Sequence, residues 1–207
     1  MTAALQHAWD ARIRQGIAPR YFDRQLDCEV VKVMPGEYEL GDAGTTLVTL
    51  LGSCVAACIR DPRTGIGGMN HFMLPEDERG TVSTNARYGA YAMEVLINEL
   101  LKRGAQRRRL EAKVFGGGNV MRGFTSAPVG ERNAAFVLEY LAREDIAVAA
   151  RDLNGTSARK VAYFVGSGRV LVRHLPIAAT AADLAAEQAY GRELRRRLVD
   201  GEVEMFT

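Results

Sequence analysis

The sequence predicts an α+β fold: a single domain of layered mixed or antiparallel β-sheets flanked by helices. Three observations lead to this prediction. Short runs of apolar and β-branched residues are separated by Gly, Pro and Asp, as in hairpin-linked strands. Longer segments carry apolar residues near a 3.6-residue period, as in helices. The 207 residues, of which 47% are hydrophobic, suffice for one core of ordinary size and are few for two.

The N-terminal 27 residues differ from the rest of the chain. Residues 3–15 have the apolar spacing of an amphipathic helix, but the following Gly16-Ile17-Ala18-Pro19 argues against its continuation. Charged residues interrupt the apolar positions of this segment, so it lacks the pattern of a secretory signal. We therefore predict a leader over 1–27, helical or mobile, and a folded domain over 28–207.

The first half of the domain is predicted to consist of strands. Short runs rich in Val, Leu, Ile and Thr alternate there with breakers such as Met34-Pro35-Gly36, Gly41-Asp42-Ala43-Gly44 and Asp61-Pro62-Arg63-Thr64-Gly65. Apolar runs on both sides of the last breaker are typical of a hairpin. The predicted strands of this half are 28–33, 37–40, 45–51, 54–60 and 66–74.

The second half mixes helices with strands. Residues 85–103 carry apolar side chains near a helical period, and Gly104 suits the C-terminal cap. A strand over 110–115 then enters the run Gly116-Gly117-Gly118-Asn119. The remaining predicted elements are the helices 132–143 and 181–199, the latter Ala-rich and charged, and the strands 146–153, 160–165 and 169–175.

Composition and charge exclude several classes of protein. The net charge is +2 and the pI about 8.5, which is too mild for a nucleic-acid-binding protein, and the runs Arg107-Arg108-Arg109 and Arg195-Arg196-Arg197 are short. No run approaches the roughly 18 apolar residues of a membrane helix. Three cysteines, an odd number, do not suggest a disulfide framework. We therefore expect a protein of the reducing cytoplasm, without membrane insertion.

The segments Leu51-Gly52-Ser53-Cys54-Val55 and Gly68-Met69-Asn70-His71-Phe72 carry the strongest chemical signal. If the hairpin turn is centred after Pro62, Cys54 and His71 lie directly opposite each other. Cβ atoms of such a pair are about 4.5–5.5 Å apart, which allows a hydrogen bond between thiol and imidazole. A register slip of one residue would place the two side chains on opposite faces.

This pair suits nucleophilic catalysis at an amide. A thiol with a pKa of about 8.5 is only slightly ionised at neutral pH, but an adjacent imidazole can accept its proton and later protonate a departing amine. Gly52 and Ser53 let the backbone approach a substrate and form an oxyanion hole with the Cys54 amide. A third group should orient the imidazole; the candidates are Thr49, which is best placed, and its competitors Thr46 and Asn70.

Other interpretations of these residues have less support. Cys58 lies on the same strand face as Cys54 without comparable neighbours, and we predict that it is a core residue. Cys54, Cys58 and His71 could bind zinc, but the spacing Cys-x3-Cys-x12-His lacks a usual fourth ligand. The run Phe115-Gly116-Gly117-Gly118-Asn119 lacks the Lys-Ser/Thr of a phosphate loop, and we predict that it lets backbone crowd the active site. We expect neither a metal nor a cofactor.

Six motifs occur in one order between about residues 30 and 175: Leu51-Gly52-Ser53-Cys54-Val55, Asp61-Pro62, Gly67-Gly68-Met69-Asn70-His71-Phe72-Met73-Leu74-Pro75, Phe115-Gly116-Gly117-Gly118-Asn119, Gly130-Glu131-Arg132-Asn133 and Gly155-Thr156-Ser157-Ala158-Arg159-Lys160. In this combination the chain resembles CheD, a family of chemoreceptor glutamine deamidases. The resemblance places the family's catalytic cysteine on Cys54 and its histidine on His71. The family also uses a threonine shortly before the cysteine. Here that position falls on Thr49, or on Val48 if the family register is one residue earlier. Candidates for contacts with substrate are Asn70, Gly117 and Asn119.

The resemblance also carries expectations about fold and function. It implies a fold related to the deamidase domain of cytotoxic necrotizing factor toxins. It implies hydrolysis of particular glutamines on methyl-accepting chemotaxis receptors to glutamates, which we expect to run through a cysteine thioester, and in some members a receptor methylesterase activity. Some members bind the phosphatase CheC. The alternative is a non-catalytic chemotaxis module that binds receptors or a CheC-type phosphatase.

Overall fold

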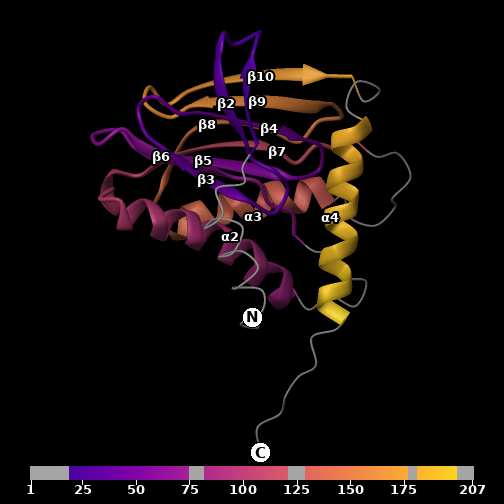
Figure 1. Cartoon of the computed structure of the whole chain (residues 1–207). Helices are drawn as coiled ribbons and strands as arrows, with labels where there is room; N and C mark the ends of the chain where they lie inside the picture. Colours follow the sequence, from indigo (N-terminus) through magenta and orange to yellow (C-terminus); the bar gives the residue numbers. More distant parts are fainter. Residues whose placement is uncertain (1–18, 75–81, 121–128, 177–180, 200–207) are drawn as a thin grey trace, which may run out of the picture.

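The computed structural model describes residues 19–74, 82–120, 129–176 and 181–199, and its strands form two stacked sheets. The first sheet has the strand order β1 (Arg20–Asp23), β2 (Cys28–Lys32), β4 (Thr46–Leu51), β9 (Ala158–Phe164) and β10 (Arg169–Leu175). The second has the order β3 (Tyr38–Gly41), β6 (Ile66–Asn70), β5 (Val55–Asp61), β7 (Glu111–Gly116) and β8 (Ala147–Leu153). Figure 1 shows the two sheets as successive layers.

Each sheet contains one parallel pair, so both are mixed. β2 pairs with β4 in parallel, β7 pairs with β8 in parallel, and the other neighbours are antiparallel. A parallel pair needs a long crossover connection, and α3 (Val129–Arg143) provides it between β7 and β8. The predicted α+β class with layered mixed sheets is therefore confirmed.

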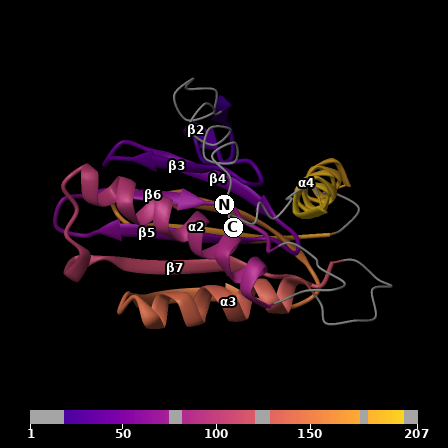
Figure 2. The same cartoon turned by 90° about the horizontal axis from the view of Figure 1, so that it is seen from below.

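Helices cover the outer face of the second sheet. α2 (Val82–Lys102) and α3 lie against this sheet (Figure 2), and a short 3₁₀ turn at Arg107–Arg109 precedes β7. α4 (Ala181–Val199) lies at one end of the sheets and across their strands (Figure 1). No helix of the described residues combines the length and the apolar character needed to cross a membrane.

β5 lies at the centre of the packing because both of its faces are buried. Val55, Ala57 and Ile59 belong to the core under α2 and α3, whereas Ala56 and Cys58 belong to the core between the two sheets. This alternation follows from the two-residue period of a strand. A strand held on both faces gives the segment directly before it, Gly52–Cys54, a fixed position.

The strands and helices predicted after residue 28 all occur, with ends that differ by a few residues. The predicted strand 66–74 is shorter: β6 ends at Asn70, and Phe72 continues the pairing only as an isolated bridge to Val55. β1 was not predicted. It lies inside the segment expected to be a leader, and it pairs with β2 of the folded domain. The helix expected over 3–15 lies outside the described residues.

Candidate active site

Cys54 lies where the chain crosses from one sheet to the other. β4 of the first sheet ends at Leu51, β5 of the second begins at Val55, and Gly52-Ser53-Cys54 connects them. The Cys54 side chain belongs to the core between the two sheets, together with those of Ala56 and Cys58. Cys54 is completely buried in this structure.

Three donors hold the carbonyl groups of this crossing. The Gly118 N–H donates to the Gly52 oxygen at 2.8 Å, and the Gly117 N–H donates to the Cys54 oxygen at 2.7 Å. The Asn133 side chain donates to the Ser53 oxygen at 2.8 Å. Because the C=O and N–H of a trans peptide point in opposite directions, fixing the Gly52 carbonyl turns the Ser53 N–H to the other side.

The glycine run after β7 allows this close backbone contact. A Cβ on Gly116 (φ +109°) would collide with the Cys54 carbonyl oxygen, and one on Gly117 (φ +65°) would lie 2.7 Å from the Gly130 oxygen. Positive φ and close approach are the two conditions under which only glycine fits without strain. Gly117, expected as a substrate contact, therefore acts through the backbone of the Cys54 segment. Asn119 is exposed, and its N–H donates to the Gly155 oxygen at 2.7 Å.

The hairpin that brings His71 to Cys54 has a register two residues from the predicted one. β5 pairs with β6 with Cys58 opposite Met69. Extending this register places Ala56 opposite His71, so the predicted direct opposition of Cys54 and His71 is wrong. A slip of two residues keeps both side chains on one face, since side chains alternate along a strand. Diagonal neighbours of this kind are still within reach of each other.

Thr49 contacts His71 and fixes the state of its ring. The Thr49 hydroxyl lies 2.8 Å from His71 Nδ1 and 2.8 Å from the Val33 carbonyl oxygen. The carbonyl can only accept, so the single hydroxyl proton goes to Val33, and Nδ1 must carry the proton of the other hydrogen bond. In the neutral ring, His71 Nε2 is then left with a lone pair. Among the described residues it is one of the buried nitrogen and oxygen atoms without a hydrogen-bond partner.

The two competitors of Thr49 lie elsewhere. The Thr46 hydroxyl accepts a weak contact from Cys28 Sγ at 3.8 Å, in the first sheet. Asn70 points to the helix side: its Oδ1 accepts the Ala57 N–H at 2.9 Å, and its Nδ2 donates to the Ala92 oxygen at 3.1 Å. The expectation that Asn70 contacts substrate is therefore corrected, because its amide joins β5 to α2 on the face opposite to His71.

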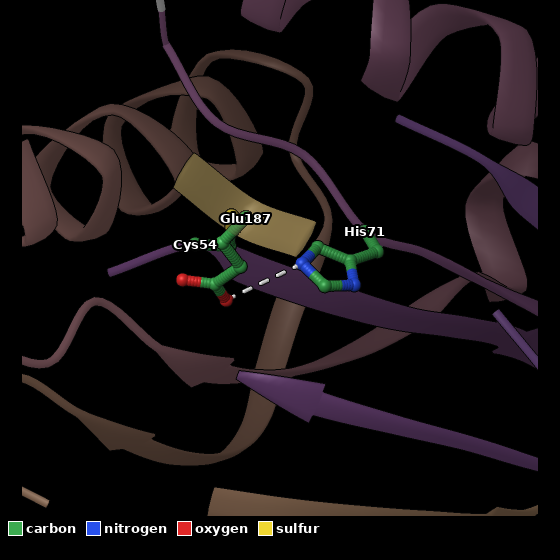
Figure 3. Close-up of side chains that lie close together, drawn as sticks. All are labelled: Cys54, His71 and Glu187. Carbon is green, nitrogen blue, oxygen red and sulfur yellow. Dashed lines mark ion pairs between the residues drawn. The ribbon is translucent and has the colours of Figure 1, made fainter. Parts of the chain in front are cut away.

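Glu187 of α4 completes the cluster, and the sequence analysis missed it. Cys54 Sγ, a ring nitrogen of His71 and a carboxylate oxygen of Glu187 lie within 4.8 Å of one another (Figure 3). Glu187 Oε1 is 3.6 Å from His71 Nε2. The sequence offered only a weak signal: Glu187 falls on the helix face that carries Leu184 and Leu194, and the structure shows that this face is buried.

The same carboxylate accepts hydrogen bonds from the backbone before Cys54. The Gly52 N–H donates to Glu187 Oε1 at 2.7 Å, and the Ser53 N–H donates to Oε2 at 3.1 Å. Both lengths lie within the range of roughly 2.7–3.1 Å expected for donors to an oxyanion. The two amides that bind this carboxylate are those of Gly52 and Ser53, the residues that the sequence analysis named for the oxyanion hole beside the Cys54 amide.

The surroundings keep the Cys54 thiol protonated. Burial raises the pKa of Cys54 well above its ordinary value, and the Glu187 carboxylate raises it further. Cys58, predicted to be a core residue, lies between the sheets, where burial also raises the pKa of its thiol. Cys58 is not part of the cluster with His71, so the zinc trio considered from the sequence is not assembled; the described residues offer Cys54, His71 and Glu187 instead.

Known proteins are similar to this chain over most of its length. A family model described as "CheD chemotactic sensory transduction" matches residues 73–174. A Thiobacillus denitrificans protein is 56% identical over 189 residues, covering 90% of this chain and 94% of its own; a Methylobacillus flagellatus protein is 54% identical over 190 residues with the same coverage. Both are named "Probable chemoreceptor glutamine deamidase CheD". A Dechloromonas aromatica protein with the same name and the number 1 is 52% identical over 203 residues, 98% of this chain and 100% of its own.

One solved structure gives a weaker match. The Neisseria meningitidis protein NMB0706 is 10% identical, covers 58% of this chain and 52% of its own, and superposes with a TM-score of 0.33. A likeness of this size carries no argument about the fold or the site.

Proposed function

The chain belongs to the CheD family, and we propose that it hydrolyses the side-chain amide of particular glutamines on methyl-accepting chemotaxis receptors. The products are a glutamate side chain and ammonia. One observation carries the proposal beyond family membership: a buried thiol, an imidazole with a free lone pair and two backbone N–H donors converge on one position. These are the groups that acyl transfer from an amide needs.

The first half of the reaction forms a thioester. His71 Nε2 accepts the Cys54 proton, and Sγ attacks the glutamine Cδ. The carbonyl oxygen becomes an oxyanion, which the Gly52 and Ser53 N–H groups stabilise. When the tetrahedral intermediate collapses, the C–N bond breaks, and the proton on His71 leaves with the amine as ammonia.

The second half regenerates the enzyme. A water molecule gives one proton to His71 Nε2 and attacks the thioester carbon, and the same N–H donors stabilise the second oxyanion. The C–S bond breaks, and Cys54 recovers its proton from His71. Thr49 keeps the proton of the ring on Nδ1 throughout, so the same nitrogen serves both halves. Thr49 is thus a positioning residue.

Several finer points of function are also proposals. An ester of glutamate would react by the same steps, so we propose receptor methylesterase activity as a second reaction of this site. We propose a CheC-type phosphatase as a binding partner and the cytoplasm as the compartment; the three cysteines, all free thiols, support a reducing environment. We also propose that 28–207 is the deamidase domain, to whose first sheet the preceding segment adds β1, and that it is related in fold to the domain of cytotoxic necrotizing factor toxins; its layered mixed sheets support that relation.

The decisive experiment measures the amide itself. Purified protein is incubated with receptor peptides that contain glutamines, and mass spectrometry follows the conversion of amide to acid together with ammonia release. We expect conversion by the wild type and none by Cys54→Ala. His71→Ala should lower the rate by roughly 10²–10⁴-fold, the usual contribution of a general acid–base group.

Circular dichroism and thermal unfolding serve as controls for the fold of both variants. Undiminished conversion by Cys54→Ala would refute the nucleophile. If the wild type binds receptors but converts no peptide, the non-catalytic module considered from the sequence is the better description.

A further inference from the structure

α4 lies directly over the Cys54 segment, with one stripe of side chains facing it. Leu184 is buried together with Val120 and Ala158. A Cβ on Gly52 would lie 2.5 Å from Leu184 Cδ2 and 2.7 Å from Glu187 Oε2, so only a glycine leaves room for α4 at this point. The close fit shows that the helix covers the segment before Cys54.

A second contact holds the next turn of α4. Tyr190 lies so close to Gly36 (φ +82°) that a Cβ there would be 2.5 Å from its ring, and its hydroxyl contacts the Tyr88 hydroxyl. Gly191 lies beside Met73, two residues after His71. α4 therefore contacts the segments that carry both Cys54 and His71, and Glu187 is at the centre of the contact.

Resting on the function proposed above, we propose that α4 is a built-in product mimic. Glu187 fills the subsite of the glutamate side chain that deamidation generates, and α4 must leave before a substrate glutamine enters. The carboxylate of Glu187 is chemically the group that the reaction produces. Its two oxygens lie on the Gly52 and Ser53 N–H groups, and it lies against His71 Nε2 beside Cys54 Sγ, as a newly formed product would.

A catalytic carboxylate is the competing role for Glu187, and the geometry argues against it. The orienting position on the imidazole is already taken, because Thr49 binds His71 Nδ1. The oxygens of Glu187 instead occupy the donors that an oxyanion requires. While α4 is seated, a substrate carbonyl cannot reach these donors, and Cys54, at 0% exposure, cannot be attacked or alkylated from solvent.

The sharpest test converts the mimic into a substrate. In Glu187→Gln, the side-chain amide carbon faces Cys54 while its oxygen can accept the Gly52 N–H. Cys54 then forms a thioester with this introduced amide of the same chain, ammonia leaves with the proton from His71, and water restores a glutamate. We expect peptide mass spectrometry to find position 187 converted to glutamate, with one ammonia released per chain.

Two controls accompany this experiment. The double variant Cys54→Ala, Glu187→Gln should keep its amide, which excludes spontaneous hydrolysis. Gln188, the exposed neighbour on the same helix, should remain a glutamine in every variant. An amide that persists at position 187 in a protein that converts receptor peptides overturns the inference while the proposed function stands. Conversion at 187 without conversion of receptor peptides supports the inference and overturns the receptor substrate.

A second measurement separates inhibition from catalysis. Glu187→Ala should raise kcat/KM on receptor peptides by roughly tenfold or more, because a larger fraction of molecules is open. It should also raise the alkylation rate of Cys54 relative to Cys28. Glu193→Ala removes the same charge from an exposed position of α4 and should change neither. A loss of activity in Glu187→Ala would assign a catalytic carboxylate and overturn the product mimic.

Discussion

The two halves of the site are built in different ways. The half that carries Thr49, Cys54 and His71 belongs to strands or adjoins them, and ladders, buried faces and side-chain hydrogen bonds from several directions hold it. The half that carries Glu187 is one helix, which side chains join to the rest of the molecule. The first half is therefore fixed, and the second is the part that can leave without unfolding the sheets.

This difference assigns roles. Groups that must keep their geometry through two acyl-transfer steps lie in the fixed half, since small displacements of such groups lower the rate strongly. The group that occupies the product position lies in the removable half. Substitutions in the fixed half should therefore lower stability or kcat, whereas substitutions of Glu187 should change access and protonation.

Replacing Asn133 should show the largest effect on the fixed half. Its Oδ1 accepts the Leu74 N–H at 2.8 Å and its Nδ2 donates to the Ser53 oxygen at 2.8 Å, so one amide joins the Cys54 segment to the chain after His71. Asn133→Ala leaves both backbone groups buried without a partner. We expect the free energy of unfolding to fall by roughly 2–6 kcal/mol, at about 1–3 kcal/mol for each of the two orphaned groups, as measured by urea denaturation.

Asn98→Ala is the matched control, because Asn98 is an exposed asparagine on α2. Its unfolding free energy should change by less than about 0.5 kcal/mol. An Asn133→Ala protein as stable as this control would show that the two segments are held independently of the amide.

Thr49 tests the fixed half at the level of a single hydrogen bond. Thr49→Val keeps the shape of the side chain but removes the group that binds His71 Nδ1, so the ring can rotate or take the other tautomer. We expect kcat on receptor peptides to fall by roughly tenfold, the equivalent of one hydrogen bond of about 1.4 kcal/mol, with KM little changed.

Thr49→Ser restores the hydroxyl and should recover most of kcat. This rescue distinguishes positioning of the ring from general loosening of β4. Equal losses in the Val and Ser variants would indicate that the methyl group and its packing matter, and that the hydrogen bond to His71 does not.

The fold was predictable where its signal is local. Alternating apolar runs and breakers predicted the strands after residue 28, and the 3.6-residue period predicted the helices. The division of the strands between two sheets was not predictable, because it depends on distant pairings. Thr46 of β4, for example, lies opposite Phe164 of β9. β1 was missed because Arg20–Asp23 is mostly exposed and lacks a buried alternating face.

For the site as well, residues close together in the sequence were predictable and distant ones were not. Cys54, His71 and Thr49 lie within one hairpin and the strand before it, so spacing and chemistry were enough to bring them together. Glu187 contacts Ser53 across 134 positions of sequence, from a helix whose charged, Ala-rich composition is typical of a solvated helix. Asn133 lies in a motif that the sequence analysis quoted, but its bonds depend on how α3 packs against the Cys54 segment.

The pH dependence of Cys54 alkylation is the finest test of the comparison between the two halves. The titratable groups that face the thiol are His71 from the fixed half, and Glu187 and Tyr190 from the removable half. Burial first and the Glu187 carboxylate second raise the pKa of Cys54, and both disfavour the thiolate. Glu187→Ala removes the negative charge and weakens the packing of α4 over Cys54. The pKa of Cys54 should therefore fall, and the rate of alkylation by iodoacetamide should rise at lower pH than in the wild type.

The Glu193→Ala profile should coincide with that of the wild type. A Glu187→Ala profile that also coincides with it would mean that α4 remains seated without its carboxylate, and that Leu184 and Tyr190 alone hold the helix over the site.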